Sequence, residues 1–298
     1  MKKIAITFAA ALYVLLFTGL HAQTPCVDTG KPAYLLYDGN GNPVTYDRMI
    51  GDLAGADVAF LGEFHNDPIS HWLEAEITRS LFEAKQGRVV LGAEMFEADM
   101  QVILDEYVQR VISDTRFEAD CRLWHNYSTD YEPLVSFARE HGLPFVATNI
   151  PRRYAEMVNK SGGVEVLETL SGQAKAWMAP LPMPLKPDSV MLSEGSIMSL
   201  FSDAPLSIAK AQAVKDATMG WMISRNLAEG SVFIHYNGSY HSNFDDGIIY
   251  FLRLYAPKVK VKTVSVVKQE DITGLDMESY AGIADYVICV PETMTLSY

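Results

Sequence analysis

The chain has 298 residues, of which 49% are hydrophobic and 20% charged, and its mean hydropathy is +0.04. These values allow one large globular core and exclude a protein built mainly of membrane spans. The formal net charge of −13 opposes binding to nucleic acid and to anionic lipid headgroups. We therefore expect no nucleic-acid partner.

Residues 1–22 have the pattern of a signal peptide. A basic start precedes an apolar stretch over residues 4–20, and small residues lead up to Gln23. An uncleaved membrane anchor is the alternative reading, because the apolar stretch is only just long enough to span a bilayer. Pro25 before Cys26 fits a lipoprotein signal poorly. The sequence thus predicts an exported protein, periplasmic or associated with the outer membrane, that is not a lipoprotein.

Three cysteines, Cys26, Cys121 and Cys289, would remain after cleavage. None belongs to a C-x-x-C pair, so a zinc site made of cysteines is not expected. An oxidising compartment would permit one disulfide and leave one thiol unpaired. Buried and unreactive cysteines are the alternative.

The rest of the chain, residues 23–298, is expected to form a single domain. Turn residues at 38–43 predict a hairpin near its start. After it, short apolar segments alternate with segments of helical periodicity, which predicts an α/β fold with a mostly parallel central sheet flanked by helices. Prolines within residues 151–205 indicate a broken helical insertion over the carboxyl ends of the strands. The predicted strands are 58–62, 89–95, 144–149, 231–237, 259–267 and 286–290, and the predicted helices are 68–85, 98–110, 131–141, 206–228 and 244–255.

Polar residues follow four of the predicted strands. Glu63 and His65 follow the first, Glu94 lies near the end of the second, Asn149 ends the third and His241 comes soon after the fourth. Carboxyl ends of parallel strands meet at one edge of a sheet, where ligands bind. We therefore expect these residues to line one pocket, and a buried ion-pair network that holds the strand ends together is the alternative.

The chemistry of this group leaves several functions open. Glu63, His65, Glu94 and His241 supply two carboxylates and two imidazoles, and on an extended segment Glu63 and His65 point to the same side. Such groups can bind a divalent metal ion or a haem iron, or act in acid–base catalysis. The residue types do not choose among these.

Other aromatic and imidazole residues are weaker candidates. His71 lies one turn into the helix that begins at Pro68 and is expected to contact the same cleft. Arg152 and Arg153 follow the third strand. No phosphate-binding glycine loop and no G-x-S-x-G turn is present in the sequence. His235 lies within an apolar strand and is interpreted as a core histidine.

These motifs are similar to those of the ChaN-like family of bacterial haem-binding proteins, which belongs to a superfamily with the Tiki metalloproteases and the erythromycin esterases. The resemblance covers about residues 45–290. The matching stretches are 61–68 with His71, 91–96, 131–134 with 138–140, 147–152, 211–213 with Asp216 and Met219, and 238–241.

The resemblance implies a cell-envelope protein that binds haem for iron acquisition, with envelope transport components as partners and a homodimer that encloses haem between its subunits. Tyr131, Tyr127 and His125 are candidates for the axial iron ligand by position and residue type. Arg152 and Arg153 are candidates to pair with the haem propionates.

The wider superfamily implies a different function as the alternative. Its enzymes use the Glu and His of the first motif for hydrolysis, with or without a metal ion. In that reading the chain is a metal-dependent peptidase or esterase in which Glu63, His65, Glu94 and His241 bind a divalent metal ion or activate water. An interaction protein without catalysis is the third possibility, since a fold by itself does not determine function.

Overall fold

A computed structural model describes residues 30–188 and 205–298. The chain divides after Pro32, and the second unit, Ala33–Tyr298, contains the fold described below. The predicted signal peptide, Cys26 and residues 189–204 of the predicted insertion lie outside the described residues. In the described ranges no helix is long and apolar enough to cross a membrane.

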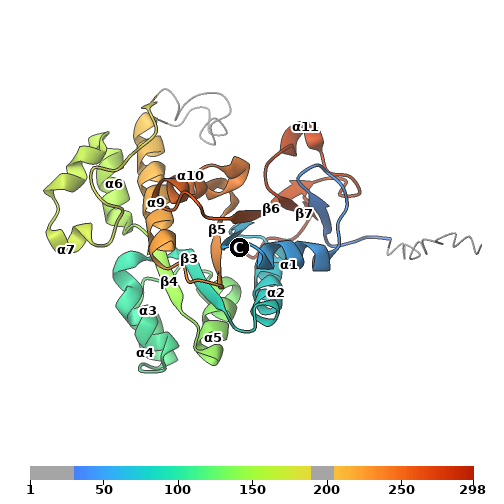
Figure 1. The fold of residues 1–298 in the computed structure, drawn as a ribbon, viewed down its shortest axis with the longest axis horizontal. Coiled ribbons are helices and arrows are strands. Elements are labelled where there is room, and N and C mark those ends of the chain that lie inside the picture. The colour runs from blue at the N-terminus through green and yellow to red at the C-terminus, as the bar shows by residue number, and fades with distance from the viewer. Residues whose placement is uncertain (1–29, 189–204) are drawn as a thin grey trace, which may run out of the picture. The chain divides into compact units, whose positions relative to one another are not determined.

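The core of the second unit is a seven-stranded sheet in the order β1-β7-β6-β2-β5-β3-β4 (Figure 1). All neighbouring strands are parallel except β1 and β7, which are antiparallel. This confirms the predicted α/β fold with a mostly parallel sheet. The strands are β1 (Leu35–Asp38), β2 (Val58–Glu63), β3 (Val89–Glu97), β4 (Phe145–Asn149), β5 (Val232–Gly238), β6 (Val261–Gln269) and β7 (Tyr286–Pro291).

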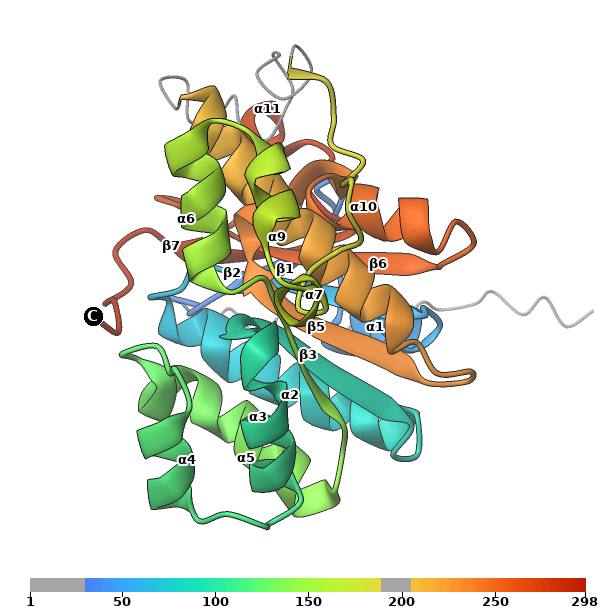
Figure 2. The same cartoon turned by 90° about the vertical axis from the view of Figure 1, so that its left-hand side faces the viewer.

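Helices cover both faces of the sheet (Figures 1 and 2). One face carries α1 (Tyr46–Ala54), α2 (Pro68–Ala84), α3 (Gln101–Val108) and α5 (Glu132–His141), and the other carries α9 (Leu206–Arg225) and α10 (Ile248–Tyr255). The remaining helical segments are η1 (Ala98–Met100), α4 (Asp114–Asp120), the π-helix η2 (Tyr127–Tyr131), α6 (Arg152–Ser161), η3 (Val164–Thr169), α7 (Gly172–Lys175), η5 (Ser239–His241), η6 (Asn243–Asp245) and α11 (Met277–Tyr280).

Side chains of the strands alternate between the two faces, as the period of an extended chain requires. In β2, Ala59 and Leu61 pack in the cluster with α2, whereas Val58 and Phe60 pack against α9 and α10. Glu63 continues the first series and therefore lies on the α2 face. By the same alternation in β3, Glu94 lies on the same face as Val90, which packs on the α9 side, and so on the face opposite to Glu63.

The predicted helix after β2 begins as expected. Asp67 precedes Pro68, and its Oδ1 accepts a hydrogen bond of 2.9 Å from the backbone N of Ser70. This bond satisfies one of the free N–H groups at the helix N-terminus.

Only a short part of the predicted N-terminal hairpin forms, with backbone hydrogen bonds from Asp38 N to Asn42 O and from Val44 N to Leu36 O. The turn at 38–43 forms, with Asp38 accepting from the backbone N of Asn40 and Asn42, but only one isolated bridge joins Tyr37 to Pro43. The chain then enters α1, and β1 pairs with β7 at the far end of the sequence. A long-range pairing of this kind leaves no local signal.

The described part of the predicted insertion begins with short helical segments and continues in irregular structure after α7. Its segments α6, η3 and α7 form a cluster with α9 through apolar side chains such as Tyr154, Val158, Leu167 and Val214. Arg152, at the start of this region, lines the pocket at the carboxyl edge of the sheet, as does Ile150 just before it.

Candidate functional site

The first part of the site follows β2. The Glu63 side chain is fully buried, and its Oε1 lies 2.6 Å from Nδ1 of His65 and accepts a hydrogen bond of 2.7 Å from the Tyr131 hydroxyl. His65 therefore points to the same side as Glu63. Burial opposes ionisation of Glu63, but the hydrogen bond from His65 and the nearby imidazole of His71 hold its pKa below the usual value. Burial likewise lowers the pKa of His65, and Glu63 more than offsets this, so the pKa of His65 is raised.

A second layer lies behind Glu63. Nδ1 of His71 is 3.2 Å from Glu63 Oε2 and 3.3 Å from Glu74 Oε2, and both His71 and Glu74 come from α2. His71 Nε2 lies 3.1 Å from the carbonyl oxygen of His65. The Nδ2 of Asn126 donates to the same carbonyl. These contacts fix the backbone that carries His65.

The third part of the site joins β3, β5 and α9. Glu94 accepts a hydrogen bond of 2.9 Å from the backbone N of Gly238 and forms an ion pair of 3.2 Å with Nε2 of His241. The other ring nitrogen of His241 lies 2.5 Å from Asp216 Oδ1. Burial opposes protonation of His241, but Glu94 and Asp216 together raise its pKa to about 10. At neutral pH this imidazole is therefore a buried cation held between two carboxylates.

Gly238 allows the part of the site that contains His65 to approach the part that contains Glu94 and His241. A Cβ at this position would lie 2.9 Å from both Cε1 and Nε2 of His65, which is closer than real contacts allow. Glycine at the end of β5 is therefore required for the observed position of the His65 ring.

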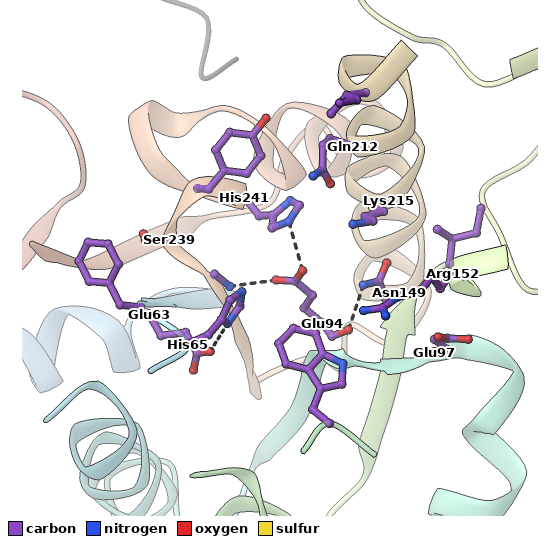
Figure 3. A pocket seen from close by; sticks show the side chains of 16 residues that line it. Glu63, His65, Glu94, Glu97, Asn149, Arg152, Gln212, Lys215, Ser239 and His241 are labelled. Atoms are coloured by element: carbon purple, nitrogen blue, oxygen red, sulfur yellow. Dashed lines mark hydrogen bonds and ion pairs between the residues drawn. The ribbon is translucent and has the colours of Figure 1, made fainter. Parts of the chain in front are cut away.

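These groups line one pocket of about 600 Å³ at the carboxyl edge of the sheet. Figure 3 shows His65, Glu94 and His241 around its centre, with Gln212 and Lys215 projecting from α9. All four residues expected to meet, Glu63, His65, Glu94 and His241, line it, as does Asn149. The other lining residues are Phe64, Glu97, Trp124, Ile150, Arg152, Ile208, Gly238, Ser239 and Tyr240.

The two tyrosines expected as iron ligands lie elsewhere. Tyr131 is buried beneath the pocket and donates to Glu63, and Tyr127 is buried in the core with Phe96 and Phe117. Neither is among the described residues that line the pocket. Their predicted role as ligands stays a prediction without support from this geometry.

The remaining candidates lie at the edge of the pocket. His125 lines an adjacent hollow of about 650 Å³, where its ring contacts that of Tyr298. Arg152 lines both hollows. Arg153 lines the second hollow, but its guanidinium is already paired with Asp99 at 2.7 Å. Arg152 is therefore better placed than Arg153 to meet an anion in the main pocket.

A compact set of three potential metal ligands differs from the predicted one. Within the described residues, ligand atoms of Glu63, His71 and Glu74 all lie within 4.8 Å of one another. Of the four predicted metal ligands, only Glu63 belongs to this set. The other three are held in the pairs described above.

Sequence reasoning gave no role to Asp216, Lys215 and Glu74. Each lies inside a helix, at a distance along the chain from the strand end it approaches. For Glu74 the only signal was an acid on an apolar helix face, and Asp216 also lies in a stretch similar to the ChaN-like family. The partners of both residues are visible only in three dimensions.

Comparison with known proteins identifies the family and the fold. The family model described as haem-binding uptake, Tiki superfamily, ChaN matches residues 49–252, which is more than half of the chain. The structure resembles that of ChaN of Campylobacter jejuni, described with cofacial haem binding, with a TM-score of 0.64 at 17% identity over 86% of this chain and 96% of that one. At this identity the likeness shows the fold.

A curated relative is the chloroplastic protein RETICULATA-RELATED 5 of Arabidopsis thaliana, 24% identical over 197 residues. The match covers 61% of this chain and 26% of the plant protein, so the chain spans about a quarter of that relative. The family model, which covers the pocket-forming strands β2 to β5, decides the assignment. The chain belongs to the haem-binding uptake family of the Tiki superfamily, the family of ChaN.

Proposed function

We propose that this chain is a cell-envelope protein that binds haem in the pocket at the carboxyl edge of its sheet and serves haem or iron acquisition. The observation that carries the proposal is a half-exposed imidazole, His65, inside a cavity of about 600 Å³. This volume lies within the range of small-molecule and cofactor sites. Apolar walls suited to a porphyrin come from Trp124, Ile150 and Ile208.

His65 is the group that we assign to the haem iron. Its Nδ1 is held by Glu63 at 2.6 Å, which leaves Nε2 for a ligand. A carboxylate behind a ligating imidazole fixes the ring and raises its basicity. Lys215 and Arg152, at the pocket wall, provide cations for the propionates. Bound haem would be the cargo of this site, delivered as a source of iron.

Hemin titration of the purified chain tests the proposal. The wild-type protein should give a Soret band that saturates at a defined ratio of haem to chain. His65→Ala should change the band and weaken binding, whereas His141→Ala, at the C-terminal end of α5 and remote from the pocket, should match the wild type. Absence of any saturable Soret band would refute haem binding, and an unchanged His65→Ala spectrum would refute the iron ligand.

Export, dimerisation and transport partners form part of the same proposal. Removal of residues 1–22, which contain two lysines and no acidic residue, would change the net charge from −13 to −15. Mass measurement of the protein from the periplasmic fraction of an expressing bacterium should give the cleaved chain. Light scattering with and without hemin tests whether haem brings two chains together.

Hydrolysis of a peptide or ester bond is the second candidate function. The specific observation in its favour is that two imidazole–carboxylate pairs, His65–Glu63 and His241–Glu94, face one pocket. Such pairs can activate water and protonate a leaving group, either directly or with a divalent metal ion. Haem transport by itself does not require the second, fully buried pair.

A substrate screen with matched variants separates the two functions. A hydrolase requires that Glu94→Gln abolish turnover of whichever peptide or ester the wild type cleaves, with or without added Mn²⁺, Co²⁺ or Zn²⁺. Glu97→Gln, at the pocket rim, is the control of the same size. No turnover by the wild type under any of these conditions would count against this function and leave the haem proposal untouched.

A further inference from the structure

The two carboxylate oxygens of Glu63 lie in different environments. Oε1 is satisfied by His65 and by the hydroxyl of Tyr131, at 2.6 and 2.7 Å. Oε2 is buried and has no hydrogen bond to any described residue, although it lies 3.2 Å from Nδ1 of His71. The carboxylate therefore directs one oxygen, which accepts no hydrogen bond from the described part of the chain, away from the pocket and towards His71.

The orientation of His71 makes this arrangement unusual. Its Nε2 lies 3.1 Å from the carbonyl oxygen of His65, and a carbonyl accepts hydrogen bonds, so Nε2 carries a hydrogen. Nδ1 then faces two carboxylates, Glu63 Oε2 at 3.2 Å and Glu74 Oε2 at 3.3 Å. A neutral imidazole would direct a lone pair at both, so either a proton on Nδ1 or a metal ion must lie between the ring and the two carboxylates. Burial opposes the proton, whereas Glu63 and Glu74 raise the pKa of His71 and favour it.

Burial increases the cost of leaving these groups without a cation. The side chains of Glu63, His71 and Glu74 are only 0%, 5% and 4% exposed. Glu74 Oε1 is also buried without a hydrogen bond to a described residue. Buried carboxylates are retained when they are paired, protonated or bound to a metal ion. The unpartnered oxygens point to an occupant beyond the protein's own side chains.

We propose that Glu63, His71 and Glu74 bind a divalent transition-metal ion, such as Zn²⁺ or Mn²⁺, at a structural site beneath the pocket. The three ligand atoms lie within 4.8 Å of one another, which is close enough for one ion. An imidazole ligand favours a transition metal over Mg²⁺ or Ca²⁺. The contact from Nε2 to a backbone carbonyl is the support that orients metal-binding histidines.

This site is distinct from the one proposed for haem. His71 and Glu74 are not among the described residues that line the pocket, and Glu63 is shared by both. The ion would hold the Glu63 carboxylate and, through Oε1, the ring of His65. The inference requires neither haem binding nor hydrolysis.

Metal analysis of the full chain, prepared without hemin, tests the inference. The protein is stripped with a chelator, dialysed against Zn²⁺ or Mn²⁺ and freed of excess metal. We expect one ion per chain and a higher Tm for the loaded protein, because a ligand that binds only the native state stabilises it. Fewer than about 0.2 ions per chain for both metals would overturn the inference in favour of a site held by protons alone.

Glu74→Gln keeps the size of the side chain and removes its charge. With a metal ion the variant should bind at least about 100-fold more weakly than the wild type, since even indirect supports of a metal site contribute 10- to 100-fold. If a proton rather than a metal ion neutralises Glu74, the amide of Glu74→Gln would simply replace a neutral carboxyl. The metal content of the variant would then equal that of the wild type. Glu76→Gln, two residues away on the outer side of α2 and paired with Arg79, is the matched control and should bind as the wild type does.

A second measurement does not depend on any variant. Co²⁺ loaded into the wild-type protein should give d–d absorption bands typical of mixed nitrogen and oxygen ligands. Bands that match those of Co²⁺ in water would contradict the site. Haem titration of the same metal-free sample shows separately whether the proposed function holds.

Discussion

Two assemblies of the same residue types meet at the pocket from opposite faces of the sheet. On the α2 face, Glu63 holds His65 and continues to His71 behind it. On the α9 face, Glu94 and Asp216 enclose His241. The alternation of side chains along β2 and β3 places the two glutamates on different faces, and the strand ends bring them back to one edge.

The two imidazoles differ in exposure and in the number of carboxylates that contact them. The His65 side chain is 36% exposed and contacts one carboxylate, whereas that of His241 is 6% exposed and contacts two. A half-exposed ring with one free nitrogen can bind a ligand. A ring with both nitrogens paired serves as a fixed positive charge. The same two residue types thus give a ligand-facing group on one side and a structural cation on the other.

Removal of Asp216 should produce the largest loss of stability. Asp216→Ala leaves the buried imidazolium of His241 with one carboxylate, and breaking a buried ion pair from one side costs about 3–5 kcal/mol. Urea unfolding at pH 7 measures this cost. Asp245→Asn, which removes one partner of the exposed pair with Arg253, should cost less than about 1 kcal/mol. Equal losses in the two variants would contradict the distinction between a buried and an exposed charge.

A third imidazole, His235 on β5, shows the behaviour expected without a carboxylate. Its ring is fully buried, with Nε2 at 2.8 Å from the Thr148 hydroxyl and Nδ1 at 2.9 Å from Asn237 Oδ1. Burial lowers the pKa of His235 from 6.5 to about 4, although the bond to Asn237 opposes the shift. The structure therefore confirms the interpretation of His235 as a core histidine.

The pH dependence of unfolding follows from that shift. Between pH 6.5 and about 4 the unfolded chain binds the proton and the folded chain does not, so the contribution of His235 is complete above pH 6.5 and is lost as the pH falls to about 4. The loss is about 3 kcal/mol, at 1.36 kcal/mol for each pKa unit. Unfolding free energies measured across this range should fall less steeply for His235→Gln. A slope identical to that of the wild type would show that His235 does not titrate in this window.

Much of this arrangement was predictable from the sequence, because its signals are local. Glu63 and Glu94 lie at or near the ends of apolar strands and His241 comes soon after another, which identifies the carboxyl edge, and parallel topology brings those ends together. The hairpin prediction captured the turn but missed the strand that pairs with β1, because that strand is β7, at the other end of the chain. Asp216 and Glu74 could not be assigned because each is an acid within a helix, with a partner that only the packed structure reveals.

Gly238→Ala should have the smallest effect on folding and a selective effect on the α2-face assembly. The backbone at Gly238 has φ −53° and ψ 131°, which alanine also adopts, so the backbone itself is not strained. The new Cβ would overlap Cε1 and Nε2 of His65, whose half-exposed ring can swing away. We expect a loss of about 1 kcal/mol or less in unfolding free energy.

Hemin affinity of Gly238→Ala should fall at least about tenfold, equivalent to 1.4 kcal/mol. Gly172→Ala, where a Cβ meets no atom within 4 Å, should change neither quantity. Unchanged hemin affinity in Gly238→Ala would mean that the position of the His65 ring does not govern the ligand, and the contrast between the two imidazoles would then lose its functional meaning.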